Sequence, residues 1–314
     1  MADFQKFLKR ALAMVLSVVG LFAVMGPATF SPVDADNLQL NFALIADTHI
    51  GNVFEINRLN LLSKGLKDIA NATVVPDTTI IAGDLTERGK PAEYLQLSSL
   101  LITHAKADTL LLAAGNHDIR GVSVGGEYRQ TYEYGAGKYF EFLSRTLGER
   151  PENIYYYKIV NGFYFIVLNT EAVDSLKNHL SPEQVAWADG VLALAAQEGK
   201  PAFVINHQSF SAIGDGNAEL DAVLRKYSGT MDIFFMSGHH HRGFGPNSVK
   251  SRGTVHYVDL PSFGKVPNNG YLEMGCGFQL EVYDREVLLR ARNFVKGEWL
   301  PEYDFTVALI NTDR

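Results

Sequence analysis

The stretch LNFALIADTH, residues 40–49, joins a nearly continuous apolar run to the polar residues Asp47 and His49. An apolar run without polar alternation is typical of a strand that is buried on both faces of a sheet. The sequence therefore predicts a core built from several such strands. Five later runs have the same character, and each is closed by polar residues or glycine: 77–82, 108–114, 163–169, 201–206 and 231–236.

Helical patterns separate several of these runs. Apolar residues recur three and four positions apart in 55–70 and in 92–105, as on one face of a helix. A third pattern, 181–196, opens with Ser181 as N-cap and Pro182 at the first helical position. Strands that alternate with helices predict a mostly wound α/β arrangement.

The C-terminal part of the chain has a different character. Residues 254–260, 278–294 and 303–310 are strand-like with little helix between them, and the middle segment predicts a hairpin that turns at Asp284 and Arg285. We expect a second sheet packed on the first within one domain. Residues 121–137 are rich in Gly and Tyr without a clear period, and they are interpreted as a long loop.

The N-terminal segment is typical of a secretory signal. Basic residues (Lys6, Lys9, Arg10) precede the apolar run 11–25, and residues 33–35, VDA, offer small side chains at the spacing of a cleavage site. We expect residues 1–35 to be the signal peptide and 36–314 the mature domain, exported to the periplasm or the cell exterior. The alternative is an uncleaved N-terminal membrane anchor, since the run is only slightly shorter than a bilayer span.

Composition narrows the class of protein. The chain of 314 residues is 46% hydrophobic and 20% charged, which predicts a globular fold with a large core. Its formal net charge of −7 disfavours a general nucleic-acid binder, because such proteins carry a basic surface. Cys276 is the single cysteine, so neither an internal disulfide nor a Cys-rich zinc site is available.

Polar residues that can bind metals follow five of the six buried strands. Ligands of α/β sheets bind beyond the carboxyl ends of the strands, so we expect these side chains to meet at one edge. Together they predict a metal site with seven candidate ligands: Asp47, His49, Asp84, Asn116, His207, His239 and His241.

The other histidines have ordinary explanations. Alternate side chains of an extended turn point the same way, so His240 is expected to face away from His239 and His241. His104 lies in a helical pattern, His179 precedes a helix cap and His256 lies in a late strand.

Seven ligands are too many for one ion, which takes about four to six. A site with two ions about 3.5–4 Å apart, bridged by one carboxylate, uses them all. Asp84 is the central carboxylate of the set and the best candidate for the bridge. Ligands of oxygen and nitrogen suit Mn, Fe or Zn.

The order D-x-H, G-D, G-N-H-D, H, G-H-x-H, from Asp47 to His241, resembles the calcineurin-like metallophosphoesterase superfamily. The resemblance implies a four-layer α-β-β-α sandwich of two mixed sheets with helices outside. It also implies that His117 is the catalytic residue, a general acid that protonates the leaving group after attack by a metal-bridging hydroxide, oriented by an acidic neighbour such as Asp118 or Glu87. By the same resemblance, one ion is held by Asp47, His49, Asp84 and His241, and the other by Asp84, Asn116, His207 and His239.

Within the superfamily, GDLTERGKPAEY (83–94) is similar to the class III cyclic nucleotide phosphodiesterase-like group. That group usually has a His-His-Pro-Pro-like turn where this chain has NHQSF (206–210), so we expect an altered pocket wall beside His207. Glu87-Arg88-Gly89 resembles the Asp-Arg-Gly of protein Ser/Thr phosphatases, but Arg88 is expected to pair with a carboxylate on the helix surface.

The resemblance implies hydrolysis of a phosphodiester, either a cyclic nucleotide or a related small diester. A phosphomonoesterase is the alternative, for which Arg88, Arg120 and Arg242 could supply extra positive charge. A metal-stabilised binding protein without turnover is the third hypothesis, with access blocked by 121–137. In that loop three tyrosines either stack on a base or pack the loop onto the domain: Tyr128, Tyr132 and Tyr134.

Overall fold

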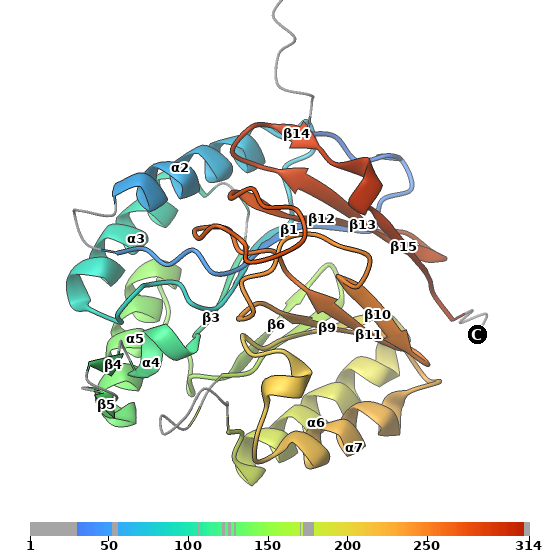
Figure 1. The fold of residues 1–314 in the computed structure, drawn as a ribbon. Coiled ribbons are helices and arrows are strands. Elements are labelled where there is room, and N and C mark those ends of the chain that lie inside the picture. Colours follow the sequence, from blue (N-terminus) through green and yellow to red (C-terminus); the bar gives the residue numbers. More distant parts are fainter. Residues whose placement is uncertain are drawn as a thin grey trace, which may run out of the picture.

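The computed structural model describes residues 30–310 except 52–55, 106, 108, 121–122, 125–126, 129, 170 and 172–178. Two mixed sheets stack face to face, and helices cover the outer face of each (Figure 1). The predicted four-layer α-β-β-α sandwich is confirmed.

The first sheet contains the strand of the opening stretch, β1 (Leu40–Ile45), at its centre. This strand pairs in parallel with β2 and antiparallel with β12. The hairpin predicted at 278–294 is formed by β12 and β13. In sheet order the strands are β14 (Glu298–Trp299), β13 (Glu286–Asn293), β12 (Cys276–Val282), β1, β2 (Thr78–Ala82) and β3 (Thr109–Ala113), with β15 (Phe305–Ala308) paired to β13.

The second sheet has a parallel centre and an antiparallel strand at each edge. Its order is β10 (Val249–Arg252), β11 (Val255–Asp259), β9 (Ile233–Ser237), β8 (Ala202–Ile205), β7 (Phe163–Val167) and β6 (Tyr156–Val160). Parallel strands in both sheets bring several carboxyl ends to the same edge of the sandwich, as the predicted site requires.

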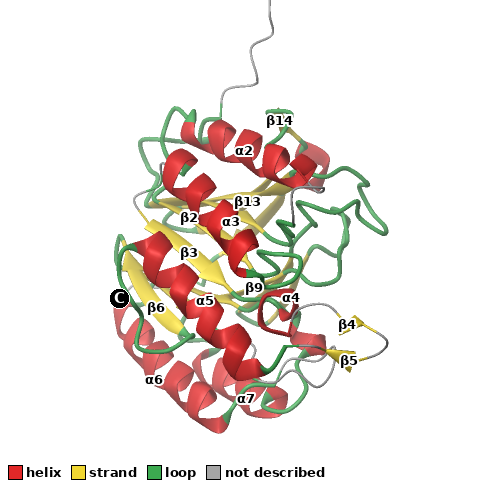
Figure 2. Ribbon diagram, turned by 90° about the vertical axis from the view of Figure 1, so that its left-hand side faces the viewer, coloured by secondary structure: helices red, strands yellow, loops and turns green. Residues whose placement is uncertain are grey.

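Helices from two parts of the chain form the outer layers (Figure 2). One group covers the first sheet: α2 (Ile56–Ala70), α3 (Pro91–His104), α4 (Asn116–Arg120) and α5 (Tyr132–Leu147). The other covers the second sheet: α6 (Pro182–Glu198) and α7 (Asn217–Tyr227). A two-stranded ribbon, β4 (Ser123–Val124) with β5 (Glu127–Tyr128), precedes α5.

Residues that alternate along β7 enter two different cores, which explains why the strands are apolar throughout. Phe165 packs between the sheets, where its ring and that of Phe203 lie 5.2 and 4.9 Å from the ring of Phe42 on the first sheet. Tyr164 and Ile166 face the opposite way and join the core beneath α6 and α7. Both faces of the sheet are therefore dry, and polar alternation would leave unpaired groups buried.

The prediction of a loop over 121–137 is wrong at its C-terminal end. Helix α5 begins at Tyr132, with Thr131 as N-cap accepting a hydrogen bond from Tyr134 N. Glycines had hidden the helical period, and Gly135 is required by packing, because a Cβ there would lie 1.8 Å from the carbonyl oxygen of Ile119. The helix buries a stripe of Tyr139, Phe142 and Leu143. Tyr132 and Tyr134 therefore lie on this helix.

Phe30 packs against the first sheet ten residues before β1 begins, and it is 4% exposed. Its ring stacks on Trp299 at 5.6 Å, and its carbonyl accepts a hydrogen bond of 2.9 Å from Thr73 N. Residues 1–29 of the predicted signal lie outside the described residues, and the boundary at residue 35 stays a prediction. Among the described residues, no helix has the length and apolar character needed to cross a bilayer.

Replacing Phe30 by Ala should lower the free energy of unfolding by about 3 kcal/mol, because the change opens a cavity beside Trp299. A chain that starts at residue 36 should lose at least as much. Chemical denaturation measures both, and Leu95→Ala is the matched control because Leu95 is 56% exposed. Equal losses in the Phe30 and Leu95 variants would show that residue 30 does not belong to the folded domain.

Candidate metal centre

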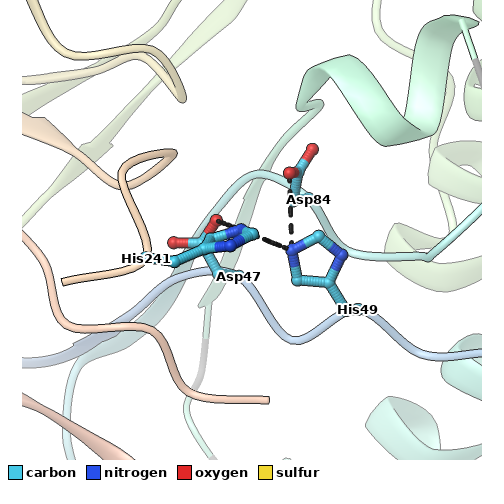
Figure 3. Close-up of side chains that lie close together, drawn as sticks. All are labelled: Asp47, His49, Asp84 and His241. Atoms are coloured by element: carbon cyan, nitrogen blue, oxygen red, sulfur yellow. Dashed lines mark hydrogen bonds and ion pairs between the residues drawn. The ribbon is translucent and has the colours of Figure 1, made fainter. Parts of the chain in front are cut away.

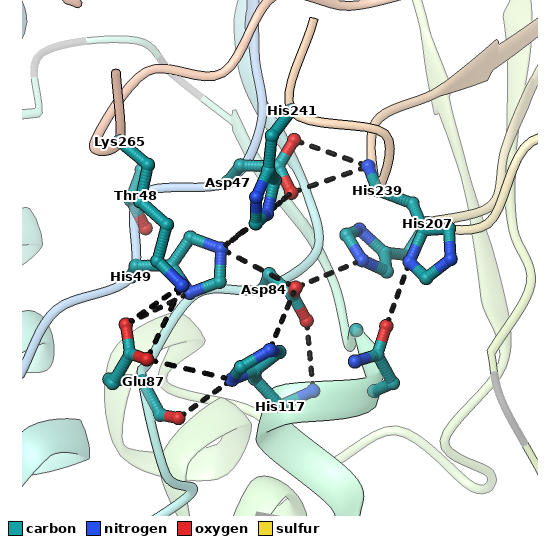
Figure 4. Close-up of polar contacts among 12 residues, drawn as sticks. Asp47, Thr48, His49, Asp84, Glu87, His117, His207, His239, His241 and Lys265 are labelled. Carbon is teal, nitrogen blue, oxygen red and sulfur yellow. Dashed lines mark hydrogen bonds and ion pairs between the residues drawn. The ribbon is translucent and has the colours of Figure 1, made fainter. Parts of the chain in front are cut away.

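The seven predicted ligands lie together at the edge where both sheets end (Figure 4). The first sheet provides Asp47 and His49 after β1 and Asp84 after β2, and α4 provides Asn116. The second sheet provides His207 after β8, with His239 and His241 after β9. The site therefore lies where the two sheets meet, and neither sheet holds it alone.

Four of these residues form a compact group whose ligand atoms all lie within 4.8 Å of one another: Asp47, His49, Asp84 and His241 (Figure 3). His49 Nε2 and His241 Nε2 face each other at 2.9 Å. Asp47 Oδ1 lies 3.3 Å from His241 Nε2, and Asp84 Oδ2 lies 3.5 Å from His49 Nε2. Two imidazole lone pairs aimed at one point between two carboxylates fit a divalent cation.

Asp84 also borders a second group. His207 Nε2 is buried and forms an ion pair of 3.2 Å with Asp84 Oδ2. Nearby, His239 Nδ1 lies 2.9 Å from Asn116 Oδ1. This geometry fits a second cation and puts Asp84 between the two groups, where a bridging ligand would lie. The assignment of individual ligands to each ion stays a prediction.

The backbone is strained where these ligands lie. Six described residues other than glycine have a positive φ angle, and five of the six are candidate ligands. Positive φ is costly for residues with a Cβ and persists where the surrounding structure imposes it, often at functional sites. The five are Asp47 (φ 56°), His49 (45°), Asp84 (44°), His239 (75°) and His241 (48°).

Two glycines of the motifs make room for ligands that come from other strands. A Cβ on Gly238 would lie 2.5 Å from Asp47 Oδ2. A Cβ on Gly83 would lie 2.4 Å from the His207 Cβ, and its φ of 83° also favours glycine. Each glycine therefore precedes one ligand and permits the close approach of another.

The side chains of this cluster differ in their protonation states. Burial favours neutral Asp84, but His207 and His117 beside it hold the pKa of this carboxyl well below its usual range. Burial likewise opposes the charge of His207, yet Asp84 raises the pKa of His207 to about 9. Burial lowers the pKa of both His49 and His239 to about 4. Two neutral imidazoles and ionised carboxylates are the protonation states that metal ions need.

His117 lies at the open side of the cluster. Its side chain is 22% exposed, its Nδ1 lies 2.8 Å from the carbonyl oxygen of Glu87, and its Nε2 lies 4.0 Å from Asp84 Oδ2. The carbonyl can accept only from a protonated Nδ1, so Nε2 is the nitrogen that faces the centre. Of the two expected orienting acids, Glu87 acts here through its main chain, since its carboxylate is 3.9 Å away.

Asp118 does not have the orienting role expected for it. Its carboxylate accepts hydrogen bonds of 2.8–2.9 Å from Leu85 N, Thr86 N and Gly115 N, so it ties the loop after β2 to the start of α4. Burial and the charge of Asp84 raise the pKa of Asp118 to about 6. Because these main-chain donors occupy the carboxylate, Asp118 does not orient the imidazole of His117.

The Glu87 carboxylate supports the centre from behind His49. Glu87 Oε2 lies 3.3 Å from His49 Nδ1, 2.6 Å from Arg58 Nη1 and 3.2 Å from Lys265 Nζ. A carboxylate behind a ligating imidazole fixes its orientation and tautomer. Sequence reasoning missed both this contact and Lys265. The signal for Lys265 was its place after β11, which is parallel to β9 and ends at the same edge.

The arginines and remaining histidines lie in other contacts. Arg88 Nη1 lies 3.4 Å from Glu93 Oε1 on α3, as expected, and Arg242 Nη1 lies 3.0 Å from Asp259 Oδ2. Arg120 is buried on α4. His104 ends α3, His179 Nδ1 lies 2.9 Å from Asp215 Oδ2, His240 Nε2 lies 2.7 Å from Ser209 Oγ, and His256 Nε2 lies 2.9 Å from Asp232 Oδ1.

Residues 40–243 match the family model of the calcineurin-like phosphoesterases. The chain belongs to the calcineurin-like phosphoesterase family. The match covers every candidate ligand and His117. Family membership and the candidate centre support divalent metal ions and metal-dependent hydrolysis of a phosphoester.

Two curated relatives of this phosphoesterase are phosphodiesterases by name. It is 26% identical over 177 residues to glycerophosphodiester phosphodiesterase GpdQ of Enterobacter lignolyticus, covering 56% of this chain and 53% of the relative. It is 24% identical over 234 residues to a probable cyclic nucleotide phosphodiesterase of Rhodococcus erythropolis, covering 71% of this chain and 67% of the relative. The first match thus spans about half the length of that relative. Both are consistent with the class III phosphodiesterase-like group.

Solved structures share the fold of this phosphoesterase. Purple acid phosphatase PPD1 from yellow lupin (Lupinus luteus) seeds superposes with a TM-score of 0.59 at 16% identity, covering 86% of this chain and 53% of that one. A dimetal phosphatase from Danio rerio superposes with a TM-score of 0.55 at 13% identity, covering 86% and 99%. At these identities the likeness concerns the fold alone.

Replacing Asp84 by Asn should lower the bound metal from two ions per chain to fewer than one, because a bridging ligand serves both groups. Elemental analysis of the purified protein measures the stoichiometry. Asp215→Asn is the matched control, since this side chain is 91% exposed. Two ions retained in the Asp84 variant would contradict its central position.

Metal binding should release a proton from His207. Its pKa is raised to about 9, so the metal-free protein carries this proton at pH 7 and loses it as the pH rises through about 9. The pair with Asp84 stabilises the metal-free fold below the ordinary His pKa, and that contribution is lost over the same rise. Metals bind the neutral imidazole, so affinity should increase by up to about tenfold per pH unit between pH 7 and 9.

Titration calorimetry in buffers of different ionisation enthalpy tests this proton release. We expect about one proton per second-site ion at pH 7, falling towards zero near pH 10. The same proton release at pH 7 from a His207→Gln variant would mean that the proton comes from another group.

Proposed function

We propose that this phosphoesterase hydrolyses phosphodiesters with two divalent metal ions and uses His117 as its proton donor. One observation carries the proposal: the imidazole of His117, which is not one of the predicted ligands, is partly exposed and has its Nε2 4.0 Å from Oδ2 of the buried Asp84. The metal centre binds the phosphoryl group, and an accessible imidazole beside it can exchange a proton with the bound substrate.

The ions, when bound, would supply Lewis-acid stabilisation of the phosphoryl oxygens and acidify a water molecule. The protein provides the rest of the chemistry. His117 holds one proton on Nδ1 against the Glu87 carbonyl, and Nε2 is turned towards the centre. When Nε2 is also protonated, it can donate this proton to the ester oxygen that leaves phosphorus. The leaving group then departs as an alcohol.

A diester is favoured over a monoester by the charges around the centre. A monoester is a dianion and calls for fixed cations beside the metals, whereas a diester carries a single charge. Arg88 pairs with Glu93 and Arg242 pairs with Asp259. The names of the two curated relatives, a glycerophosphodiester phosphodiesterase and a probable cyclic nucleotide phosphodiesterase, also favour a diester substrate. We infer a cyclic nucleotide or a related small diester as substrate, with Mn, Fe or Zn as the metal.

We also propose that the enzyme is exported. The basic and apolar pattern before residue 26 supports a signal segment, and the burial of Phe30 supports a folded domain that includes residues N-terminal to the predicted boundary at 35. A membrane-attached form would require that this segment remain uncleaved.

The diester preference is tested with a matched pair of aryl substrates. Protein reconstituted with Mn²⁺ should have a higher kcat/KM for an aryl phosphodiester than for the corresponding monoester. The reverse order would favour the phosphomonoesterase, with Lys265 as the nearest candidate cation because it lies 3.2 Å from the Glu87 carboxylate. No turnover of either ester by fully metallated protein would favour the non-catalytic binding protein.

Replacing His117 by Ala should lower kcat for the diester by about 10²–10⁴-fold while both ions remain bound. The loss should shrink for esters of acidic phenols, because such leaving groups need no proton. His179→Ala is the control, since His179 is outside the predicted ligand set and its Nδ1 lies 2.9 Å from the carboxylate of the exposed Asp215. Full activity in the His117 variant, or loss of its metal, would sink the proton-donor role.

A further inference from the structure

A pocket of about 310 Å³ lies beside the metal centre. Its inner wall is made by Ser209 and His240, which are joined by a hydrogen bond of 2.7 Å. Ser209 follows the candidate ligand His207 by two residues, and His240 lies between His239 and His241 in the chain. The ring of His240 also lies 5.5 Å from that of the candidate ligand His239, so a molecule held at the metal centre could extend into this pocket past His240.

Aromatic rings form the floor of the pocket. The ring of Phe210 lies 5.6 Å from that of Phe235 at 86° and 5.3 Å from that of Tyr257 at 61°. Phe235 is buried, while Phe210 and Tyr257 are half-buried and can contact a ligand. Such edge-to-face clusters offer ring faces on which an aromatic or heterocyclic group stacks. The floor therefore favours a ligand with a planar ring.

The rim of the pocket is positively charged although the whole chain is acidic. Arg242, Lys250 and Arg252 line it, and Asp259 is the single acid among its lining residues. Arg242 Nη1 lies 3.0 Å from Asp259 Oδ2, so this acid is already neutralised. Arg252 Nη1 also lies 3.9 Å from Asp221 Oδ1, an acid outside the lining. With both acids counted, three cations face two anions, a net charge of +1 against −7 for the chain. A local positive field of this kind attracts an anionic group.

We infer that this pocket binds one ester group of the substrate, and that this group carries a planar ring and a negative charge in addition to the reacting phosphate. The inference rests on the proposed phosphodiesterase function of the metal centre. A nucleotide ester with a further phosphate has this chemistry, since its base can stack on Phe210 and Tyr257 while the second anionic group meets Lys250 and Arg252. A cyclic mononucleotide has the base but no second anionic group, so the inference narrows the proposed substrates. A small aliphatic diester would use neither the ring faces nor the net positive charge of the rim.

Two p-nitrophenyl phosphodiesters that differ by one charge test the inference. One has phenyl as its other ester group and the other has 4-carboxyphenyl. The Mn²⁺-loaded wild-type protein should have a lower KM for the charged ester. A Lys250→Glu/Arg252→Glu variant should raise the KM of the charged ester relative to the neutral one by about three- to tenfold, as expected for two exposed charges near an anion.

The control variant carries the same change of charge on another face. Lys64→Glu/Lys67→Glu alters two exposed lysines of α2, which covers the first sheet, and it should leave the KM ratio at the wild-type value. The preference for the charged ester should also shrink in 0.5 M salt, since exposed charges are screened. Phe210→Ala should raise the KM of both esters because both rings lose their stacking surface.

The outcomes separate this inference from the proposed function. Hydrolysis of both esters with equal KM values, unaffected by the Lys250/Arg252 and Phe210 changes, would overturn the pocket's role while leaving the phosphodiesterase intact. A lower KM for an ester with a long alkyl group than for either aryl ester would instead mean that a lipid-derived group occupies the pocket. Hydrolysis of neither ester would refute the phosphodiesterase proposal itself.

Discussion

The Asp84 carboxylate holds the two halves of the metal centre in one place. One oxygen lies 3.2 Å from His207 Nε2 and 3.5 Å from His49 Nε2, and the other accepts a hydrogen bond from the main-chain nitrogen of His117. These partners come from the second sheet, the first sheet and α4. Because a buried carboxylate is tolerated only when cations or donors surround it, this one residue requires both sheets and the helix to be correctly packed.

A third buried carboxylate beside the site, that of Asp118, binds the backbone. Asp118 accepts from three main-chain nitrogens and thereby joins the loop that carries Asp84 to the turn that carries Asn116 and His117. The strained φ angles of the ligands persist because bonds of this kind over-determine the loops. The buried strands and the hydrogen bonds of Asp118 hold these side chains in place before any ion binds. This preorganisation reduces the rearrangement that metal binding requires.

Sequence reasoning placed the candidate ligands at one edge of the sandwich, where the structure also brings them, because strand ends and short polar motifs are local signals. The six buried strands, the helices at 55–70, 92–105 and 181–196, and the late hairpin were all found in this way. Reasoning failed where tertiary contacts decide: the period of α5 is hidden by its glycines, of which Gly135 packs against α4, and the edge strand β6 is too exposed to read as apolar. The contacts of Asp118 with Leu85 and Thr86 and of Lys265 with Glu87 were missed because these partners lie far away in the sequence.

Gly238 has a consequence for how this centre can vary. The space that its missing side chain leaves is filled by the carboxylate of Asp47, a residue of the other sheet. The first motif of the chain and the last are therefore coupled sterically, not only through a shared ion. A side chain introduced at position 238 would clash with Asp47 unless residue 47 changed as well. Redesign of the ligand set therefore has to change paired positions of the two motifs together.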